Sequence, residues 1–313
     1  MSTVAIGTAL RTMVIVNPTS GAGANGRRWR RTARALRQAL GSFEHAFTER
    51  PLHASELARR ALHSGYEMIV AVGGDGTLNE VVGGFFEAGR RVAPQAVLGV
   101  VALGTGSDFA RTLGRPGLDE ACARLAGRDS RLVDVGHARF TGHDGALRER
   151  VFLNVASFGC SGLVARLVSP RLKRASGALA FTLATVRALA TFRDQPVSIS
   201  IDGGATLDYS ITNCAFCNAR FFGAGVQVAP AAQIDDGRFD VTLWSGFGLV
   251  DFIRKHRSLY NGTHVTEPGT RLLTACRARA DSPAIVLFEL DGESVGRLPV
   301  EIRILPHALR LKV

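Results

Sequence analysis

The stretch Gly73-Gly74-Asp75-Gly76-Thr77-Leu78-Asn79-Glu80-Val81 directly follows a short apolar run, Met68 to Val72. That run is typical of a buried strand, and Leu78 to Phe86 is predicted to continue as a helix with Thr77 as its cap. Glycines between the two leave backbone N–H groups open to an anion. A carboxylate beside phosphates requires a divalent cation, so we interpret Asp75 as a magnesium contact. A turn with no ligand is the alternative interpretation.

Strands and helices are predicted to alternate through the first 136 residues, which favours an α/β domain with a doubly wound, mostly parallel sheet. Ligands of such sheets bind at the carboxyl ends of the strands. The predicted strands are Met13–Asn17, His45–Thr48, Met68–Val72 and Val97–Ala102, and the predicted helices are Arg27–Leu40, Ala54–His63, Leu78–Phe86 and a short one from Asp108.

Residues 137–299 have a different pattern, with many strand-like runs and few helical ones, which indicates a second, β-rich domain packed as a sandwich. The last segment, 300–313, also alternates like a strand, and one possibility is that it returns to the first domain. The strand-like runs are Val151–Phe158, Val197–Ile201, Tyr209–Phe216, Phe239–Trp244, Arg271–Ala278 and Ala284–Leu290.

One segment of the second domain is helical in pattern. Basic residues precede the apolar run Ala178 to Val186, and such a segment fits either the surface of an anionic membrane or a core-packed helix with a basic rim. The basic residues are Arg166, Arg171, Lys173 and Arg174.

Composition narrows the class of protein. The chain has 313 residues, 46% of them hydrophobic, enough for two globular domains. No run is long and apolar enough to span a bilayer, no signal peptide is indicated, and five scattered cysteines suggest reduced thiols, so a cytoplasmic protein is expected. Cys214 and Cys217 have the spacing of a metal or redox pair, but no second ligand pair accompanies them.

The net charge of +11 favours an anionic partner, such as a phosphorylated ligand or an acidic membrane surface. Six arginines lie between Arg27 and Arg37, and a solvated helix face explains them better than a dedicated binding patch. A nucleic-acid partner would rest on charge alone and is not expected.

Two further glycine loops follow predicted strands. Asn17-Pro18-Thr19-Ser20-Gly21-Ala22-Gly23 follows the first strand, and Leu103-Gly104-Thr105-Gly106-Ser107-Asp108-Phe109-Ala110-Arg111 follows the strand that ends at Ala102. All three loops should therefore converge on one edge of the sheet.

Together with Ile234-Asp235-Asp236-Gly237-Arg238-Phe239-Asp240 and Leu290-Asp291-Gly292-Glu293, the three loops stand in the order found in the diacylglycerol kinase catalytic-domain family, which the chain resembles over nearly its whole length. The resemblance implies a kinase that transfers phosphate from ATP to a lipid hydroxyl, with Mg²⁺ as cofactor. It implies a nucleotide-binding first domain and a lipid-acceptor second domain that meet at a cleft.

The resemblance also assigns roles to residues. Asp75 and Asp108 would organise magnesium and the triphosphate, and Asp291, in the Asp-Gly-Glu motif with Glu293, would accept the proton of the attacking hydroxyl. A structural magnesium would be bound by the Asp236 side chain and the carbonyls of Gln233 and Arg238. The expected nucleotide contacts are Asn17, Ser20, Thr48, Gly73, Gly74, Asp75, Gly76, Thr77, Leu78, Asn79, Gly104 and Thr105.

Several alternatives stay open at this point. Ser107 stands where the third motif usually has asparagine, which changes the hydrogen bonds available to the nucleotide loop. Diacylglycerol is the expected acceptor, but a sphingoid base, ceramide or phosphatidylglycerol is not distinguished by any motif. NAD kinase shares the Gly-Gly-Asp-Gly loop but not Asn17-Pro18 or Asp291-Gly292-Glu293. A catalytically weak nucleotide-sensing, membrane-binding protein, peripheral membrane association and a homodimer are further hypotheses.

Overall fold

The first domain is built on a parallel sheet with helices on both faces. The computed structural model describes residues 10–21, 23–103, 107–168 and 177–313. Neighbouring strands of this sheet lie in the order β17-β6-β3-β1-β2, and every pair among them is parallel. The strands that begin and end within this domain are β1 (Thr12–Val16), β2 (Glu44–Phe47), β3 (Met68–Gly73) and β6 (Val97–Ala102).

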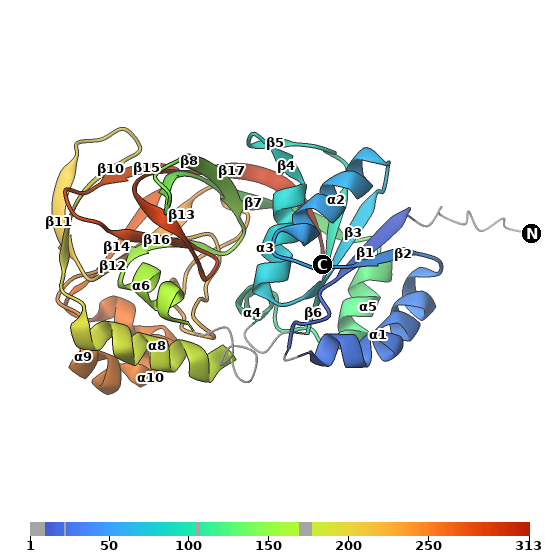
Figure 1. The fold of residues 1–313 in the computed structure, drawn as a ribbon, viewed down its shortest axis with the longest axis horizontal. Coiled ribbons are helices and arrows are strands. Elements are labelled where there is room, and N and C mark those ends of the chain that lie inside the picture. The colour runs from blue at the N-terminus through green and yellow to red at the C-terminus, as the bar shows by residue number, and fades with distance from the viewer. Residues whose placement is uncertain (1–9, 22, 104–106, 169–176) are drawn as a thin grey trace, which may run out of the picture.

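Strand β3 shows why both faces of the sheet are covered. All six of its residues are buried, because side chains alternate between a face covered by α1 (Ala24–Leu40) and α5 (Leu118–Ala126) and a face covered by α2 (His53–His63) and α3 (Asp75–Gly84). The doubly wound arrangement predicted from the alternating pattern is confirmed (Figure 1). The six arginines of α1 are all exposed, as a solvated face requires.

The helix after the glycine turn begins earlier and ends sooner than its apolar pattern predicts. Asp75 is its first residue and Gly74 its N-cap, so the prediction that Thr77 caps the helix is wrong. Thr77 is instead buried inside the first turn, where its hydroxyl accepts a hydrogen bond from Asn17 Nδ2 at 2.9 Å. The helix ends at Gly84 because glycine is a poor helix former, and the chain continues into a small hairpin, β4 (Phe86–Glu87) with β5 (Arg90–Arg91).

The second domain is a β-sandwich whose strands pair antiparallel. Its interior contains six fully buried phenylalanines from strands of both layers, at positions 140, 152, 158, 216, 239 and 288. The strands are β7 (Ser130–Gly142), β8 (Leu147–Phe152), β9 (Val155–Gly159), β10 (Gln195–Ile201), β11 (Leu207–Ile211), β12 (Asn213–Cys217), β13 (Phe239–Trp244), β14 (Thr270–Ala275), β15 (Arg277–Asp281), β16 (Leu287–Leu290) and β17 (Glu293–Lys312).

Three runs predicted as single strands are each two strands with a break between them. The breaks fall at Leu153–Asn154, at Thr212 and at Cys276. At each break, backbone N–H groups or the hydroxyl pair with an aspartate from elsewhere in the chain: Asp291, Asp194 and Asp202, respectively. An apolar pattern carries no record of such long-range partners, which explains the errors.

Helices cover one outer face of the sandwich. They are α6 (Cys160–Leu167), α8 (Gly177–Thr191), α9 (Leu249–Arg254), α10 (His256–Asn261) and the 3-10 turn η1 (Thr263–Thr266). The apolar helix predicted near Ala178 is α8, but α6, α9 and α10 were not predicted. A third core lies between these helices and the sheet, and it includes Trp244, Phe252 and Leu259. Among the described residues, no helix is long and apolar enough to cross a membrane.

The Cys214 and Cys217 side chains face opposite sides of β12. Cys214 packs in the sandwich core, and Cys217 packs in the core beneath the helices. Both are free thiols and fully buried. The spacing therefore comes from core packing in a strand, and it does not make a metal or redox pair.

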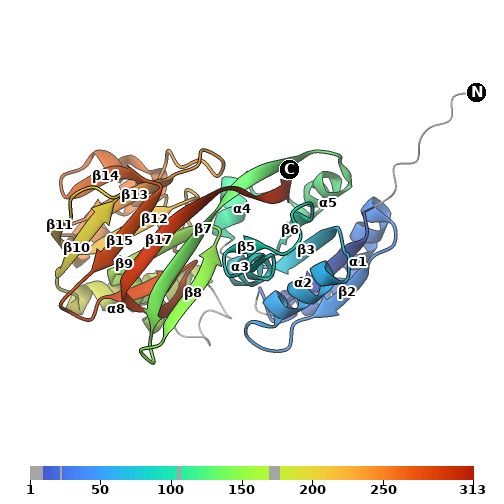
Figure 2. The same cartoon turned by 90° about the horizontal axis from the view of Figure 1, so that it is seen from above.

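Strand β17 links the two domains. It pairs antiparallel with β7 along most of its length, and at its end Arg310 and Leu311 pair in parallel with Val97 and Leu98 of β6. Figure 2 shows β7 and β17 running together from the sandwich toward the parallel sheet. One strand thus belongs to both domains.

Candidate active site

A large cavity lies where the glycine loops of the first domain face the helices of the second. Its volume is about 620 Å³. The first domain contributes Asn17, Ser20, Gly74 to Thr77 and Asp108, and the Asp291-Gly292-Glu293 turn lies in the same wall. The other half is largely apolar and is lined by Val164, Phe181, Leu189, Trp244, Phe252 and Leu259. The cavity therefore joins a polar, glycine-rich half to an apolar chamber.

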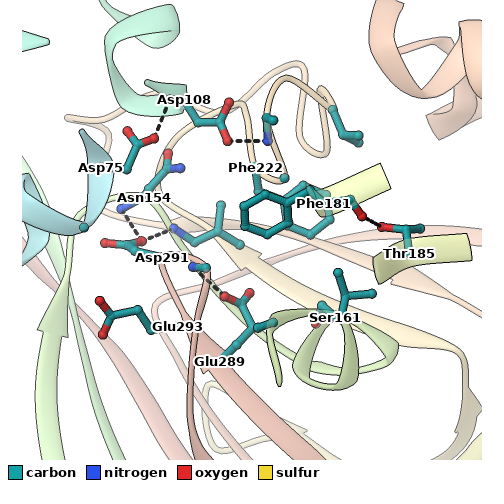
Figure 3. A pocket seen from close by; sticks show the side chains of 18 of the residues that line it. Asp75, Asp108, Asn154, Ser161, Phe181, Thr185, Phe222, Glu289, Asp291 and Glu293 are labelled. Carbon is teal, nitrogen blue, oxygen red and sulfur yellow. Dashed lines mark hydrogen bonds between the residues drawn. The ribbon is translucent and has the colours of Figure 1, made fainter. Parts of the chain in front are cut away.

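Asp75 and Asp108 lie together at the polar end, as Figure 3 shows. Asp75 Oδ2 accepts a hydrogen bond from the Asp108 N–H at 2.9 Å, and Oδ1 accepts one from the Phe109 N–H at 3.2 Å. The second glycine loop thereby positions the third. The convergence of these loops, expected from their places at strand ends, is present in the structure.

Asp108 is a buried carboxyl with a perturbed pKa. Burial, and then the charge of Asp75, raise its pKa to about 6, although the Ala224 N–H donates to Oδ2 at 2.9 Å and Arg111 Nε lies 3.3 Å from Oδ1. A carboxylate whose proton affinity is raised by an adjacent carboxylate is one that a divalent cation would stabilise in its ionised form. The residues present therefore fit a magnesium ion beside the triphosphate.

Asp291 is held in a backbone cradle. Its Oδ1 accepts from the N–H groups of Asn154 at 3.0 Å and Val155 at 2.8 Å, and its Oδ2 accepts from the Leu153 N–H at 3.1 Å. Burial raises the pKa of Asp291 to about 7, against these three donors, which favour the ionised form. A carboxylate with a pKa near 7 matches the proton affinity that a general base needs at neutral pH.

Asn79 connects the first-domain helix to this cradle. With its amide nitrogen oriented toward the second domain, Asn79 donates to Asp291 Oδ2 at 3.3 Å and to the Val151 carbonyl at 3.2 Å. Glu293, in the same turn as Asp291, forms an ion pair of 3.2 Å with Arg150. Both domains thus fix the position of Asp291.

Asn17 organises the first loop. Its Nδ2 donates to Thr77, and its Oδ1 accepts from the backbone N–H and the hydroxyl of Thr19 at 3.0 and 2.8 Å. Ser20 lies in the same loop and lines the cavity. The expected nucleotide contacts Gly74, Gly76 and Thr77 also line it.

The other expected nucleotide contacts lie elsewhere. Leu78 is buried in the core, so only its backbone faces the turn, and Thr48 lies past the end of β2 without lining the cavity. Gly73 ends β3, where a Cβ would lie 2.5 Å from Thr77, so the close packing of strand on helix requires glycine. Gly104 and Thr105 lie outside the described residues.

The loop expected to hold a structural metal is stabilised by protein contacts. Asp134, fully buried in β7, accepts hydrogen bonds from the N–H groups of Gly237 at 2.6 Å and His307 at 2.7 Å. The Asp236 carboxylate pairs with its neighbour Arg238 at 3.2 Å. Gln233 is exposed, and the described residues contain no cluster of three His, Cys, Asp or Glu side chains that could hold a metal. A metal would rely on one carboxylate and on carbonyls, so the structural site remains a prediction.

A group of cavity residues in the second domain was not predicted from the sequence. Asn154 donates an N–H to Asp291, and Ser161, Asn213 and Glu289 line the cavity. None belongs to a glycine motif. The sequence signal that could have found one of them is the carboxylate of Glu289, which lies in β16 two residues before Asp291.

Comparison with known proteins agrees with this architecture. Residues 11–138 match the model of the diacylglycerol kinase catalytic domain, and residues 154–313 match that of the YegS C-terminal NAD kinase beta sandwich-like domain. A diacylglycerol kinase of Bacillus subtilis (strain 168) is 30% identical over 93% of this chain and 92% of its own. One of Mycobacterium tuberculosis (strain H37Rv) is 26% identical over 82% of this chain and 80% of its own.

Solved structures share the fold. A crystal structure from Bacillus anthracis str. Sterne aligns with a TM-score of 0.78 at 23% identity, covering 100% of this chain and 98% of that one. A second, described as a diacylglycerol kinase of the same organism, aligns with a TM-score of 0.71 at 21% identity, covering 98% and 97%. The chain belongs to the diacylglycerol kinase catalytic-domain family, and this membership supports a kinase that acts on a lipid or a small molecule.

Proposed function

We propose that this chain is an ATP-dependent, magnesium-requiring lipid kinase that phosphorylates the free hydroxyl of diacylglycerol. The observation that carries the proposal is the position of Asp291. It lies between the glycine loops, which suit a triphosphate, and an apolar chamber, which suits acyl chains. A carboxylate with a pKa of about 7 at that junction can take the proton of a hydroxyl as its oxygen attacks the γ-phosphorus.

Different residues of the chain would bind the phosphates, hold the magnesium and position Asp291 during this transfer. N–H groups of the glycine turn and of the α3 N-terminus would bind the phosphate oxygens, and Asn79 and the cradle would hold Asp291 toward the acceptor. Asp75 and Asp108 would hold magnesium, which when bound would neutralise charge on the phosphates. The hydroxyl oxygen forms the new bond to phosphorus, its proton goes to Asp291, and ADP leaves.

The direct experiment is transfer of radiolabelled phosphate from ATP to micellar lipids in the presence of magnesium. The panel contains diacylglycerol, monoacylglycerol, sphingosine, ceramide and phosphatidylglycerol. We expect labelled phosphatidic acid as the main product, and Asp291→Asn to lower its rate by roughly 10²-fold to 10⁴-fold while ATP binding persists. Equal loss of ATP binding in the variant would contradict the role of Asp291 as a base, and a different labelled lipid would name another acceptor.

We further propose that helices α8 and α9 rest on an anionic membrane. Their outer faces expose Leu183 (50%), Val250 (58%) and Ile253 (66%), while Phe181 and Phe252 of the same helices line the cavity. The same helices carry exposed cations, Arg187 on α8 and Arg254 on α9, and α10 carries the exposed Arg257. Apolar side chains flanked by arginines suit the interface of an acidic bilayer. The basic residues Arg171, Lys173 and Arg174 lie outside the described residues.

Vesicle sedimentation tests this surface. Val250→Ser with Ile253→Ser should release the protein from phosphatidylglycerol vesicles, whereas Leu207→Ser, an equally exposed leucine on β11, should not. Equal binding by both variants would contradict the proposal.

A further inference from the structure

The apolar half of the cavity contains a group of neighbouring polar side chains, here named the polar corner: Ser157, Ser161, Asn213 and Glu289. Ser157, Asn213 and Glu289 are at most 3% exposed. Ser161, Asn213 and Glu289 line the cavity itself, and Ser157 lies behind them. Figure 3 shows Glu289, Ser161 and Asp291 lining one pocket. Polar groups so deeply buried in an apolar wall require partners.

Counting protons fixes what the polar corner presents to the cavity. The Ser157 hydroxyl contacts both Ser161 Oγ, at 2.7 Å, and a Glu289 carboxyl oxygen. Ser157 has one proton, so it donates to only one of these partners. If Glu289 is neutral, its proton goes to Ser157, the Ser157 proton goes to Ser161, and the Ser161 proton points outward as a donor. If Glu289 is ionised, the chain reverses and Ser161 presents only lone pairs.

The surroundings of Glu289 favour the neutral form. It forms no ion pair with a described Lys or Arg, and its charged neighbours, Asp291 and Glu293, are negative. The Gly292 N–H donates to Oε2 at 2.7 Å, which leaves the other oxygen for Ser157. Burial raises the pKa of Glu289 to about 8, above that of Asp291.

Asn213 adds a second donor beside Ser161. Its Oδ1 accepts from the Ser161 N–H at 2.8 Å, and because a backbone N–H can only donate, this contact fixes the orientation of the amide. The Nδ2 group is then the free end, and no described residue accepts a hydrogen bond from it. A buried, unpaired donor in a cavity wall is costly unless a ligand supplies the acceptor.

We propose that the polar corner binds the carbonyl oxygen of an acyl ester in the acceptor, with Ser161 and Asn213 as donors and Glu289 as the positioning residue. The inference rests on the proposed function. Glu289 lies in the last part of β16 and Asp291 in the turn that follows it, and both line the same cavity. The glycerol backbone of a diacylglycerol separates its free hydroxyl from an ester carbonyl by a few bonds, so one molecule can reach Asp291 and the polar corner together.

The test compares two acceptors that differ only in the carbonyl groups. These are a 1,2-diacylglycerol and the 1,2-dialkylglycerol ether of equal chain length, in the same mixed micelles. The wild-type kcat/KM should favour the diester by roughly 10-fold or more, the value of one to two hydrogen bonds. Ser161→Ala and Asn213→Asp should each bring this ratio toward one. Asn213→Asp keeps the oxygen that accepts from Ser161 while removing the donor.

Two control variants separate recognition from packing. Glu289→Gln keeps a neutral donor and should preserve the ratio, whereas Glu289→Ala should lower it. Thr185→Val removes another hydroxyl of the cavity, one that already donates to the Phe181 carbonyl at 2.8 Å, and should not change the ratio. Glutamine cannot ionise. If Glu289→Gln loses the preference for the diester over the diether, the subsite requires an ionised carboxylate, as a cationic sphingoid base would, and the proposal is contradicted.

The two proposals fail differently. If both glycerolipids are phosphorylated at equal rates, and Ser161→Ala affects both equally, the subsite is overturned while the kinase stands. If neither glycerolipid is phosphorylated by the wild type, the proposed function fails and the subsite fails with it.

Discussion

At the scale of single residues, Asp291 combines local strain with long-range contacts. Its φ of 49° lies in the left-handed region, which aspartate tolerates better than most residues, and the next residue, Gly292, has a φ of 82°. This turn brings the carboxylate to three N–H groups at the break between β8 and β9. The Asp-Gly sequence therefore allows the turn locally, and two distant segments, the β8–β9 break and Asn79 of α3, then hold the Asp291 carboxylate by hydrogen bonds.

Glu289 should make stability depend on pH. A glutamate in the unfolded chain has a pKa near 4.5, whereas in the folded protein the pKa of Glu289 is about 8. Between these pH values the carboxyl ionises in the unfolded state but not in the folded state, so ionisation lowers the free energy of the unfolded state alone. Stability from this group is therefore present below about pH 4.5 and lost as pH rises to about 8. We expect Glu289→Gln to match the wild type at pH 5 and to exceed it at pH 8.5 by on the order of a few kcal/mol.

Urea unfolding of both proteins at pH 5, 7 and 8.5 measures this difference. Groups distant from Glu289 titrate alike in both proteins, so the gap between the two curves reports on Glu289 and on the carboxyls coupled to it, Asp291 and Glu293. A gap that stays constant across the pH range would show that Glu289 ionises equally in the folded and unfolded states.

At the scale of elements, the sequence predicted the parts whose signal is local. Runs such as Met68 to Val72 and the glycine loops after them carry their own periodicity and turn residues, and Asp75 and Asp108 were found through them. Asp291 was found through the resemblance of its Asp-Gly-Glu motif to the family. The strand breaks, the helices α9 and α10 and the polar corner could not be found in this way. Each depends on partners distant in sequence, such as Asp291 for Asn154 or Glu289 for Ser157.

The loop 233–238 illustrates a contact that the motif did not reveal. It was expected to owe its order to a metal at Asp236, whereas Asp134 already accepts a hydrogen bond from the Gly237 N–H of this loop and another from the His307 N–H of β17. Asp134→Ala would leave both N–H groups without their acceptor, at roughly 1–3 kcal/mol each. We therefore expect Asp134→Ala to lower the free energy of unfolding by about 2–4 kcal/mol. Asp134→Asn should recover part of this loss, because its amide keeps one carbonyl oxygen as an acceptor.

Asp236→Ala is the matched comparison. Its ion pair with Arg238 is partly exposed and is worth about 0–1 kcal/mol. Thermal unfolding with magnesium and with a chelator decides the question of the metal. If chelation lowers the melting temperature of the wild type but not of Asp236→Ala, a structural magnesium at Asp236 is supported. If Asp236→Ala loses more free energy of unfolding than Asp134→Ala, the primary role of Asp134 is contradicted.

At the scale of the whole molecule, β17 makes the two domains one structural unit. Its first residues pair with β16, its middle with β7 and β15, and its end with β6 of the parallel sheet. The turn 291–293 lies where this strand begins, and the core of the first domain lies where it ends. A substitution that destabilises one domain should therefore also lower the stability of the other.

Leu311 allows this coupling to be measured. It is fully buried in the first-domain core and lies opposite Leu98 in β6, so Leu311→Ala should cost about 2–5 kcal/mol. The chain has two tryptophans, Trp29 on α1 and Trp244 on β13, so Trp29→Phe and Trp244→Phe backgrounds each report on one domain by fluorescence. We expect Leu311→Ala to lower the urea midpoint equally in both backgrounds, whereas Leu207→Ala, at an exposed site, changes neither. A shift seen only through Trp29 would show that the domains unfold independently.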